Sequence, residues 1–280
     1  MTKGVGYMFI AGLFFAFMNV VVKLVPDIPA IEIVFFRSLI SFVLTFSYLK
    51  AAKIPIFGNN KKWLILRGLT GAISLSMYFY TLQKIPLASA VTIQFLSPVF
   101  TSILGVYIIK EKVYSVQWLF YLLSFIGLVI IQGFDPRVSP TMLIIGLTAS
   151  VFAGLAYNFI RKINKNEHPL VIVFYFPLIT VPLTAIYCAF NWVMPSGIEW
   201  FYLLLIGIFT QVAQYFMTMS YQAEDLSRVA SIKYFSIVYA LGLGYVFFDE
   251  TFPVEVYGGI TLIILGVIMN LYFKNTKAKE

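Results

Sequence analysis

Long apolar runs, separated by short links that carry Pro, Gly, Lys, Asp or Asn, make up almost the whole chain. Each run has roughly the 20 residues that a helix needs to span a bilayer, and about ten such runs occur. They fall at residues 4–24, 31–49, 63–82, 88–109, 116–132, 141–160, 171–190, 199–220, 227–247 and 254–273. Continuous apolar character does not fit the alternation of a strand, and lipid admits only helices and closed barrels. We therefore predict an all-α membrane protein with ten transmembrane helices, the first of them too long to be a cleaved signal sequence.

The low charge content excludes a soluble protein. Of the 280 residues, 60% are hydrophobic and 11% are charged, whereas about a quarter of the residues of a soluble domain are charged. A soluble protein of this composition could not cover its surface with polar groups. The net charge is +8, and the basic residues lie mainly in the links between apolar runs. We therefore interpret them as the residues that set the orientation of the chain in the membrane, and we expect no nucleic-acid partner.

Cys188 and His168 are the only cysteine and histidine of the chain. One cysteine excludes an internal disulfide, and a single residue of each kind cannot build a Cys/His metal cluster. We expect no metal and no other cofactor. The Gly-x-x-x-x-Gly-Lys motif of nucleotide-binding loops is also missing from the sequence, so any work that the protein does would draw its energy from a gradient or from exchange.

Basic residues gather on alternate links, which predicts an orientation. With the amino terminus in the cytoplasm, the inner side holds Lys3, Lys50, Lys53, Lys61, Lys62, Lys110, Lys112, Arg161, Lys162, Lys165, Arg228, Lys274, Lys277 and Lys279. The outer side holds the bases Lys23, Lys84 and Arg137 and the acids Asp27, Asp135, Glu199, Asp249, Glu250 and Glu255. The positive-inside rule then predicts a multi-pass protein of the cytoplasmic (inner) membrane with both termini in the cytoplasm.

The two halves of the sequence resemble each other at a constant offset of 139 positions. The matches join Asn19 to Asn158, Ile33 to Ile172, Val34 to Val173, Phe35 to Phe174, Ile93 to Ile232, Ser97 to Ser236, Gly105 to Gly244, Glu111 to Glu250 and Gly127 to Gly266. We predict one repeat at 1–139 and a second at 140–280. With five helices each, the second repeat enters the membrane from the opposite side, as in secondary transporters whose solute site lies near the midplane.

A set of motifs makes the resemblance specific. They are the stretch 79–90 (FYTLQKIPLASA), Ser97-Pro98, Lys110-Glu111-Lys112, Phe35-Phe36-Arg37-Ser38 and Arg67-Gly68. Together they resemble the ten-helix EamA branch of the drug/metabolite transporter superfamily. The resemblance implies a carrier with a central cavity lined mainly by the first, third and fourth helices and by their repeat mates, the sixth, eighth and ninth. The junction Ala223-Glu224-Asp225-Leu226 departs from the pattern because it lacks the Pro of the first half.

Ionisable residues at membrane depth are costly and are therefore candidate binding groups. Lys233 lies roughly 9 Å into the ninth predicted helix, and its repeat mate is Gln94. Its ammonium group is suited to bind a carboxylate or phosphate, and the alternative is that its long stem carries the charge to the inner headgroups. If Lys233 binds the solute, Lys233→Ala would abolish or sharply weaken binding without unfolding the protein.

Two arginines lie near the ends of predicted helices. Arg37 is about 9 Å inside the second helix, where either an ion pair with Glu32 or Asp27 or an anionic solute would satisfy it. Arg67 is about one turn inside the third helix, and we expect its guanidinium group to reach the inner headgroups.

Neutral polar residues complete the predicted binding site. Helical spacing places some of them on shared faces, and they are Tyr78, Gln94, Ser97, Tyr157, Asn158, Gln211 and Gln214. The alternative is that they hold helices together by hydrogen bonds. Pro98 interrupts the backbone ladder of the fourth helix. For Glu111 and Glu250, which flank helix ends at equivalent positions, we expect a structural role rather than proton coupling.

These features favour a secondary transporter that moves a small organic metabolite, anionic or zwitterionic, by alternating access between the repeats. One alternative is an exporter of neutral amino acids or other amphipathic metabolites. An intramembrane enzyme is less favoured, because we find no Ser/His/Asp set and no carboxylate pair, and a non-transporting membrane scaffold also stays open. The expected partners are the solute and the bilayer, and the sequence leaves monomer and homodimer open.

Overall fold

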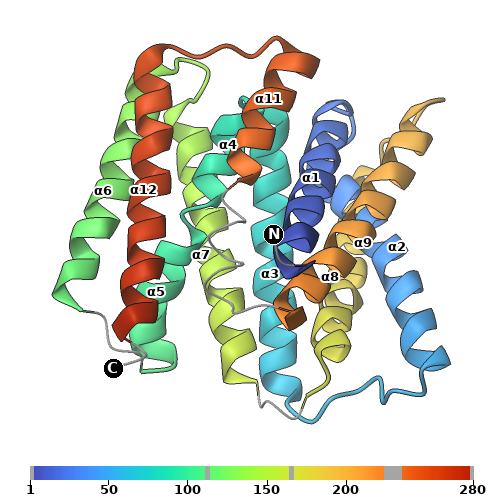
Figure 1. Cartoon of the computed structure of the whole chain (residues 1–280). Helices are drawn as coiled ribbons and strands as arrows, with labels where there is room; N and C mark the ends of the chain where they lie inside the picture. Colours follow the sequence, from blue (N-terminus) through green and yellow to red (C-terminus); the bar gives the residue numbers. More distant parts are fainter. Residues whose placement is uncertain (1–2, 111–113, 164–166, 224–234, 278–280) are drawn as a thin grey trace.

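The computed structural model describes residues 3–110, 114–163, 167–223 and 235–277, and these are helical with no strand among them (Figure 1). The helices are α1 (Lys3–Lys23), α2 (Ala30–Ala51), α3 (Lys61–Lys84), α4 (Leu87–Gln94), α5 (Ser97–Ile108), α6 (Ser115–Phe134), α7 (Pro140–Lys162), α8 (Pro169–Asn191), α9 (Glu199–Ala223), α11 (Ser236–Phe248) and α12 (Val254–Lys277). The prediction of an all-α protein is confirmed for this part of the chain. Of the predicted span 227–247, residues 227–234 lie outside it.

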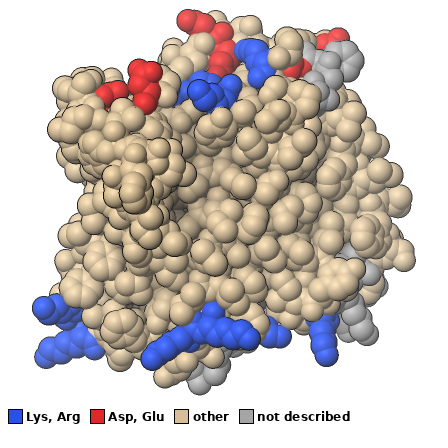
Figure 2. Space-filling view, turned by 180° about the vertical axis from the view of Figure 1, so that it is seen from behind, with Lys and Arg blue, Asp and Glu red and all other residues tan. Residues whose placement is uncertain are grey.

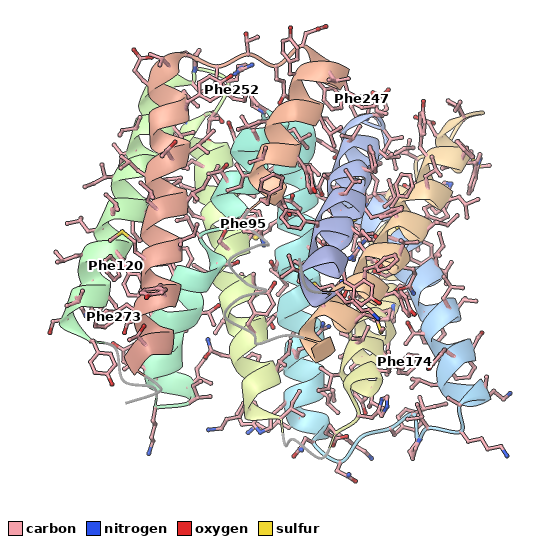
Figure 3. All side chains as sticks on the ribbon, in the orientation of Figure 1. Phe95, Phe120, Phe174, Phe247, Phe252 and Phe273 are labelled. Atoms are coloured by element: carbon pink, nitrogen blue, oxygen red, sulfur yellow. The ribbon has the colours of Figure 1, made fainter. Side chains whose placement is uncertain are left out.

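The fourth predicted span is two helices rather than one. α4 ends at Gln94 and α5 begins at Ser97, so a turn at Phe95 and Leu96 separates them, and Phe95 lies midway along the bundle (Figure 3). Pro98 explains the break, because it has no N–H to donate to a carbonyl one turn earlier. Side chains of α7 bind carbonyls on both sides of the break: Ser150 Oγ donates to Ile93 O at 2.8 Å, and Asn158 Nδ2 donates to Thr101 O at 2.9 Å.

The helices pack in a small number of long pairs. α1 lies along α9, α3 along α7, α2 along α8, and α6 along α12. The α6–α12 pair forms one edge of the bundle (Figure 1), and α5 and α11 lie beside α7 and α1. Small residues permit these close approaches: a Cβ at Gly154 would lie 2.9 Å from the Thr101 N of α5, and one at Gly127 would collide with the Gly259 carbonyl of α12.

Charged residues concentrate at the two ends of the bundle. On the face drawn in Figure 2, one end carries only Lys and Arg, the other carries acids and bases, and uncharged side chains fill the band between. We call the first the basic end, with Lys50, Lys53, Lys61, Lys62, Lys110 and Lys162, and the second the acidic end, with Asp27, Asp135, Glu199, Asp249, Glu250 and Glu255. In the part of the chain that the structure describes, six segments are long and apolar enough to cross a membrane: Lys3–Lys23, Ala30–Ala51, Leu87–Ile108, Pro140–Ile160, Leu170–Asn191 and Glu199–Met217. This distribution is that of a multi-pass membrane protein.

The contact between α6 and α12 provides a test of the fold. Gly127→Ala should destabilise the protein by about 1–3 kcal/mol, because the added methyl group meets backbone atoms that cannot rotate away. The matched control is Gly258→Ala on α12, where an added Cβ meets nothing within 4 Å. Thermal melting of the two variants in detergent measures the difference, and equal melting temperatures would contradict the close α6–α12 packing.

Candidate functional site

A partly open pocket of about 180 Å³ lies between helices α2, α3, α4, α7, α8 and α9. Its polar lining residues are Arg37, Ser41, Arg67, Ser74, Tyr78, Gln94, Tyr157, Thr210 and Gln214. A second cavity, of about 440 Å³, lies at the acidic end around Asp27 and Lys84, both of which are exposed. We regard the smaller pocket as the candidate site, because it is where cationic side chains are held inside the bundle. We call it the central pocket.

Arg67 is held inside the bundle by its position on α3. Its guanidinium carbon lies 5.2 Å from the centre of the Phe176 ring of α8, and its Nε and Nη1 atoms are buried and have no hydrogen-bond partner. The expectation that Arg67 reaches the headgroups is therefore wrong. The reason is that α8 covers this face of α3, so the side chain packs on Phe176 in the central pocket. Buried N–H groups without partners are costly, and they are the donors that a bound anion would satisfy.

Arg37 projects from α2 into the same pocket. Its Nε donates to Thr210 Oγ1 of α9 at 3.0 Å, and its guanidinium carbon lies 5.6 Å from the Phe176 ring centre. The ion pair considered from the sequence does not form in the described structure. Glu32 Oε2 instead accepts a hydrogen bond from the Val193 N in the α8–α9 link. Both arginines thus keep their charges without a described carboxylate beside them.

Four more of the predicted site residues line the central pocket: Tyr78, Gln94, Tyr157 and Gln214. Tyr78 is hydrogen-bonded to the Asn19 side chain of α1, and Gln94 Oε1 is buried without a hydrogen-bond partner. Gln94 stands at the end of α4, immediately before the break in the fourth span. The pocket thus holds an unpaired acceptor as well as unpaired donors.

The remaining predicted site residues lie elsewhere. Asn158 faces α5, where it binds Thr101 O, and Gln211 Nε2 donates to the Ser41 carbonyl at 3.2 Å. Ser97 is buried at the start of α5 and does not line the pocket. Asn158 and Gln211 therefore join helices to one another, as the alternative interpretation proposed. Lys233 lies outside the described residues, and its role as a solute ligand stays a prediction.

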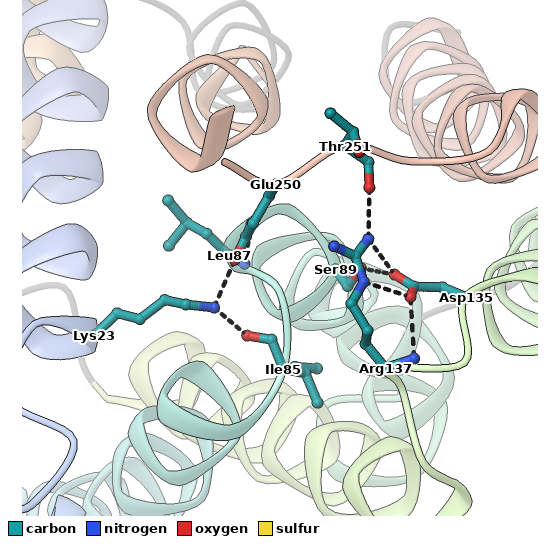
Figure 4. Close-up of polar contacts among 8 residues, drawn as sticks. All are labelled: Lys23, Ile85, Leu87, Ser89, Asp135, Arg137, Glu250 and Thr251. Atoms are coloured by element: carbon teal, nitrogen blue, oxygen red, sulfur yellow. Dashed lines mark hydrogen bonds and ion pairs between the residues drawn. The ribbon is translucent and has the colours of Figure 1, made fainter. Parts of the chain in front are cut away.

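A buried ion pair connects helices at the acidic end. Lys23 Nζ at the end of α1 lies 2.6 Å from Glu250 Oε1 in the α11–α12 link (Figure 4). Lys23 also donates to Ile85 O at 2.7 Å, and Glu250 Oε2 accepts from the Leu87 N at the start of α4 at 2.8 Å. Glu250 is only 7% exposed. These contacts join α1, the α3–α4 link and the α11–α12 link, in agreement with the structural role expected for Glu250.

A second group of contacts lies beside this pair. Arg137 Nε binds Asp135 Oδ1 at 2.8 Å, and Arg137 Nη2 donates to Thr251 O at 2.8 Å (Figure 4). Ser89 Oγ donates to Asp135 Oδ2 at 3.5 Å. The α6–α7 link is thereby attached to the α11–α12 link and to α4. Together the two groups, which we call the acidic-end closure, hold links from both halves of the chain in contact.

Comparison with known proteins decides the family. Residues 2–133 and residues 140–272 each match the EamA-like transporter family. The chain belongs to this family. As an EamA-like protein, it is a multi-pass membrane transporter for a small metabolite, in agreement with the resemblance of its motifs.

Curated relatives and a solved structure cover nearly the whole EamA-like chain. The pseudopaline exporter of Pseudomonas aeruginosa is 33% identical over 270 residues, or 95% of each chain. Solute carrier family 35 member G1 of Homo sapiens is 26% identical, over 98% of this chain and 81% of that one. The riboflavin transporter of Vibrio cholerae is 24% identical, over 99% and 96%. A crystal structure, at 17% identity, matches with a TM-score of 0.63 over 99% of this chain and 97% of the other, and it supports the fold.

The acidic-end closure makes a testable prediction. Glu250→Gln removes the charge that faces Lys23, and an unpaired buried partner costs about 3–5 kcal/mol. We expect a cysteine at Ala156, which lines the central pocket, to be labelled from the acidic end at least about ten-fold faster in this variant. The measurement uses a membrane-impermeant methanethiosulfonate reagent in a Cys188→Ala background.

Glu255→Gln is the matched control, because Glu255 is an exposed acid at the same end. The charge-swapped pair Lys23→Glu/Glu250→Lys should return the labelling rate toward that of the parent. Labelling of the Glu250→Gln variant at the rate of the Glu255→Gln control would show that the ion pair does not close the pocket.

Proposed function

We propose that this EamA-like protein is a secondary transporter that moves a small organic anion or zwitterion across the cytoplasmic membrane by alternating access between two inverted repeats. The observation that carries the proposal is the central pocket, which two arginines line and where two buried nitrogen donors of Arg67 are unpaired. Charged groups are costly inside a membrane protein and mark solute pathways. The pocket of about 180 Å³ is smaller than the roughly 300–1,000 Å³ of drug-sized sites, so it suits a small metabolite.

The helix pairs support two inverted repeats, 1–139 and 140–280. With an offset of 139 positions, α1 corresponds to α7 and α3 corresponds to α9. If the two halves are exchanged, the pair α1–α9 becomes the pair α7–α3, and both pairs occur in the structure. The same exchange turns the pair α2–α8 into itself, because α2 corresponds to α8, and it does the same for the pair α6–α12. A twofold axis that relates the two halves has these consequences, and the odd number of helices per half favours an axis in the membrane plane.

Contacts between individual residues support the same relation. In the α6–α12 pair, Gly127 packs on the Gly259 carbonyl, and its repeat mate Gly266 packs on the carbonyl of Phe120, the repeat mate of Gly259.

The charge distribution supports an orientation with the basic end and both termini in the cytoplasm. The acidic-end closure would then separate the central pocket from the outside. In the proposed mechanism the two repeats exchange conformations, which opens the acidic end and closes the basic end around the same pocket. Two relatives export pseudopaline and transport riboflavin, respectively. Their solutes differ, and both agree with transport of a small metabolite.

Flux through a locked protein tests the mechanism. Cysteines at Lys23 and Glu250, in a Cys188→Ala background, would be joined by a short bis-methanethiosulfonate crosslinker. Proteoliposomes loaded with a ¹³C-labelled bacterial metabolite extract would release the solute before crosslinking, lose this flux after it, and regain it on reduction. Mass spectrometry on both sides of the membrane identifies what moved.

The same experiment separates the alternatives. An intramembrane enzyme would change the chemical identity of a metabolite without moving it, and a scaffold would do neither. Undiminished flux after complete crosslinking would contradict alternating access through the acidic end. The uncrosslinked double variant is the control for the loss of the ion pair itself.

A further inference from the structure

Two guanidinium groups converge on the central pocket from different helices. Arg37 on α2 and Arg67 on α3 both lie against the Phe176 ring, with their guanidinium carbons 5.6 Å and 5.2 Å from its centre. They are close enough to interact electrostatically. Two like charges in a protein interior repel each other more strongly than they would in water. The pocket therefore holds two positive charges close together, although they repel each other.

No acidic side chain balances this charge within the described residues. The described lining of the pocket contains no Asp or Glu. The buried carboxylate nearest along α2, Glu32, accepts a hydrogen bond from the Val193 N instead, and the described ion pairs of the chain lie at the acidic end. A solute with one negative charge would leave one of the two arginine charges uncompensated, and uncompensated buried charge is strongly unfavourable. A solute with two negative charges would balance both.

The unpaired atoms of Arg67 also indicate an anionic ligand. Nε and Nη1 both lack a hydrogen-bond partner. A carboxylate binds a guanidinium group side-on through Nε and Nη2, as Asp135 does with Arg137, or end-on through Nη1 and Nη2, so either arrangement would give one of the two unpaired atoms a partner. Arg37 uses its Nε for Thr210, so its terminal nitrogens are the atoms that can meet a second anionic group.

We propose that the solute of the central pocket is a small organic dianion with two separate carboxylate groups, one bound to the guanidinium group of Arg67 and the other to that of Arg37. The proposal rests on the proposed function in taking the central pocket as the solute site. Gln94 Oε1, the unpaired acceptor in the pocket, would receive a hydroxyl or N–H group of the same solute. The small volume limits the spacing of the two carboxylates to a short carbon chain.

The test compares matched ligands on the purified full-length protein. Binding is measured as thermal stabilisation by malonate, succinate, glutarate and adipate, each against the monocarboxylate of equal chain length. Alanine serves as a zwitterion, and glycerol 3-phosphate carries two charges on one group. The best dicarboxylate should bind at least about ten-fold more tightly than its monocarboxylate, because it gains hydrogen bonds to a second charged group.

Variants of Arg67 link the preference to the pocket. Arg67→Gln should remove the difference between dicarboxylate and monocarboxylate, whereas Arg67→Lys, which keeps the charge and loses the planar guanidinium group, should retain the preference at lower affinity. Lys62→Gln, an exposed lysine on the same helix, is the matched control and should bind as the parent does. Size-exclusion chromatography and the melting temperature without ligand establish that each variant is folded.

The outcomes distinguish this proposal from the proposed function. Equal or tighter binding of monocarboxylates, alanine or glycerol 3-phosphate would overturn the dicarboxylate assignment, as would an Arg67→Gln variant that keeps the full preference. Counterflow of the same ligands in proteoliposomes is measured in parallel. Dicarboxylate binding without flux would support the assignment and contradict transport, whereas flux of other metabolites without dicarboxylate binding would do the reverse.

Discussion

The absence of water in the hydrocarbon core governs this structure, because each polar group placed there must find its partner within the protein. The break between α4 and α5 shows how the constraint is met. Ser150 and Asn158, two turns apart on one face of α7, bind carbonyls of Ile93 and Thr101 on either side of the break. Gly146 and Gly154 lie on the same face and let α7 approach closely enough for these bonds to form. A break in a spanning helix is thus tolerated because a neighbouring helix supplies the partners.

Against this background, the groups that lack partners are informative. Arg67 Nε and Nη1 and Gln94 Oε1 are buried, unpaired and placed around one pocket, where the protein provides both donors and an acceptor. Other buried atoms without a partner, among them Ser38 Oγ, Thr92 Oγ1 and the Oδ1 atoms of Asn19 and Asn158, belong to residues that do not line this pocket. The concentration of unmet hydrogen-bonding capacity in the central pocket is the physical basis for assigning the solute to it.

The sequence predicts the positions of the described helices well, because a bilayer imposes both length and composition on a segment that crosses it. Pro98 predicts an interruption of the hydrogen-bond ladder in the fourth span. It does not predict that α4 and α5 are separate helices, because that break also depends on the hydrogen bonds that α7 donates to carbonyls on both sides of it. Of the predicted site residues, Tyr78 and Gln94 line the pocket, and their role as solute ligands stays a prediction. Arg67, expected at the headgroups, also lines the pocket. The number of residues between Arg67 and the end of its helix gives only its depth along that helix. That α8 covers Arg67 depends on how the helices pack, which the sequence alone does not show. Gln211 illustrates the converse, because a polar residue at helical spacing binds a neighbouring helix as readily as a ligand.

The two ends of the bundle are held differently, and this asymmetry connects the pocket to the proposed mechanism. Lys23 at the acidic end is largely buried and paired with Glu250, whereas its repeat mate Lys162 at the basic end is exposed and donates to the Ile108 carbonyl at 3.1 Å. Two similar sequences therefore hold equivalent lysines in different environments. If the halves are inverted repeats, the closed environment of Lys23 is one that Lys162 can also adopt, and the free energies of the two arrangements differ by a limited set of contacts. A carrier needs that near-balance, because a strongly preferred arrangement would trap the solute on one side.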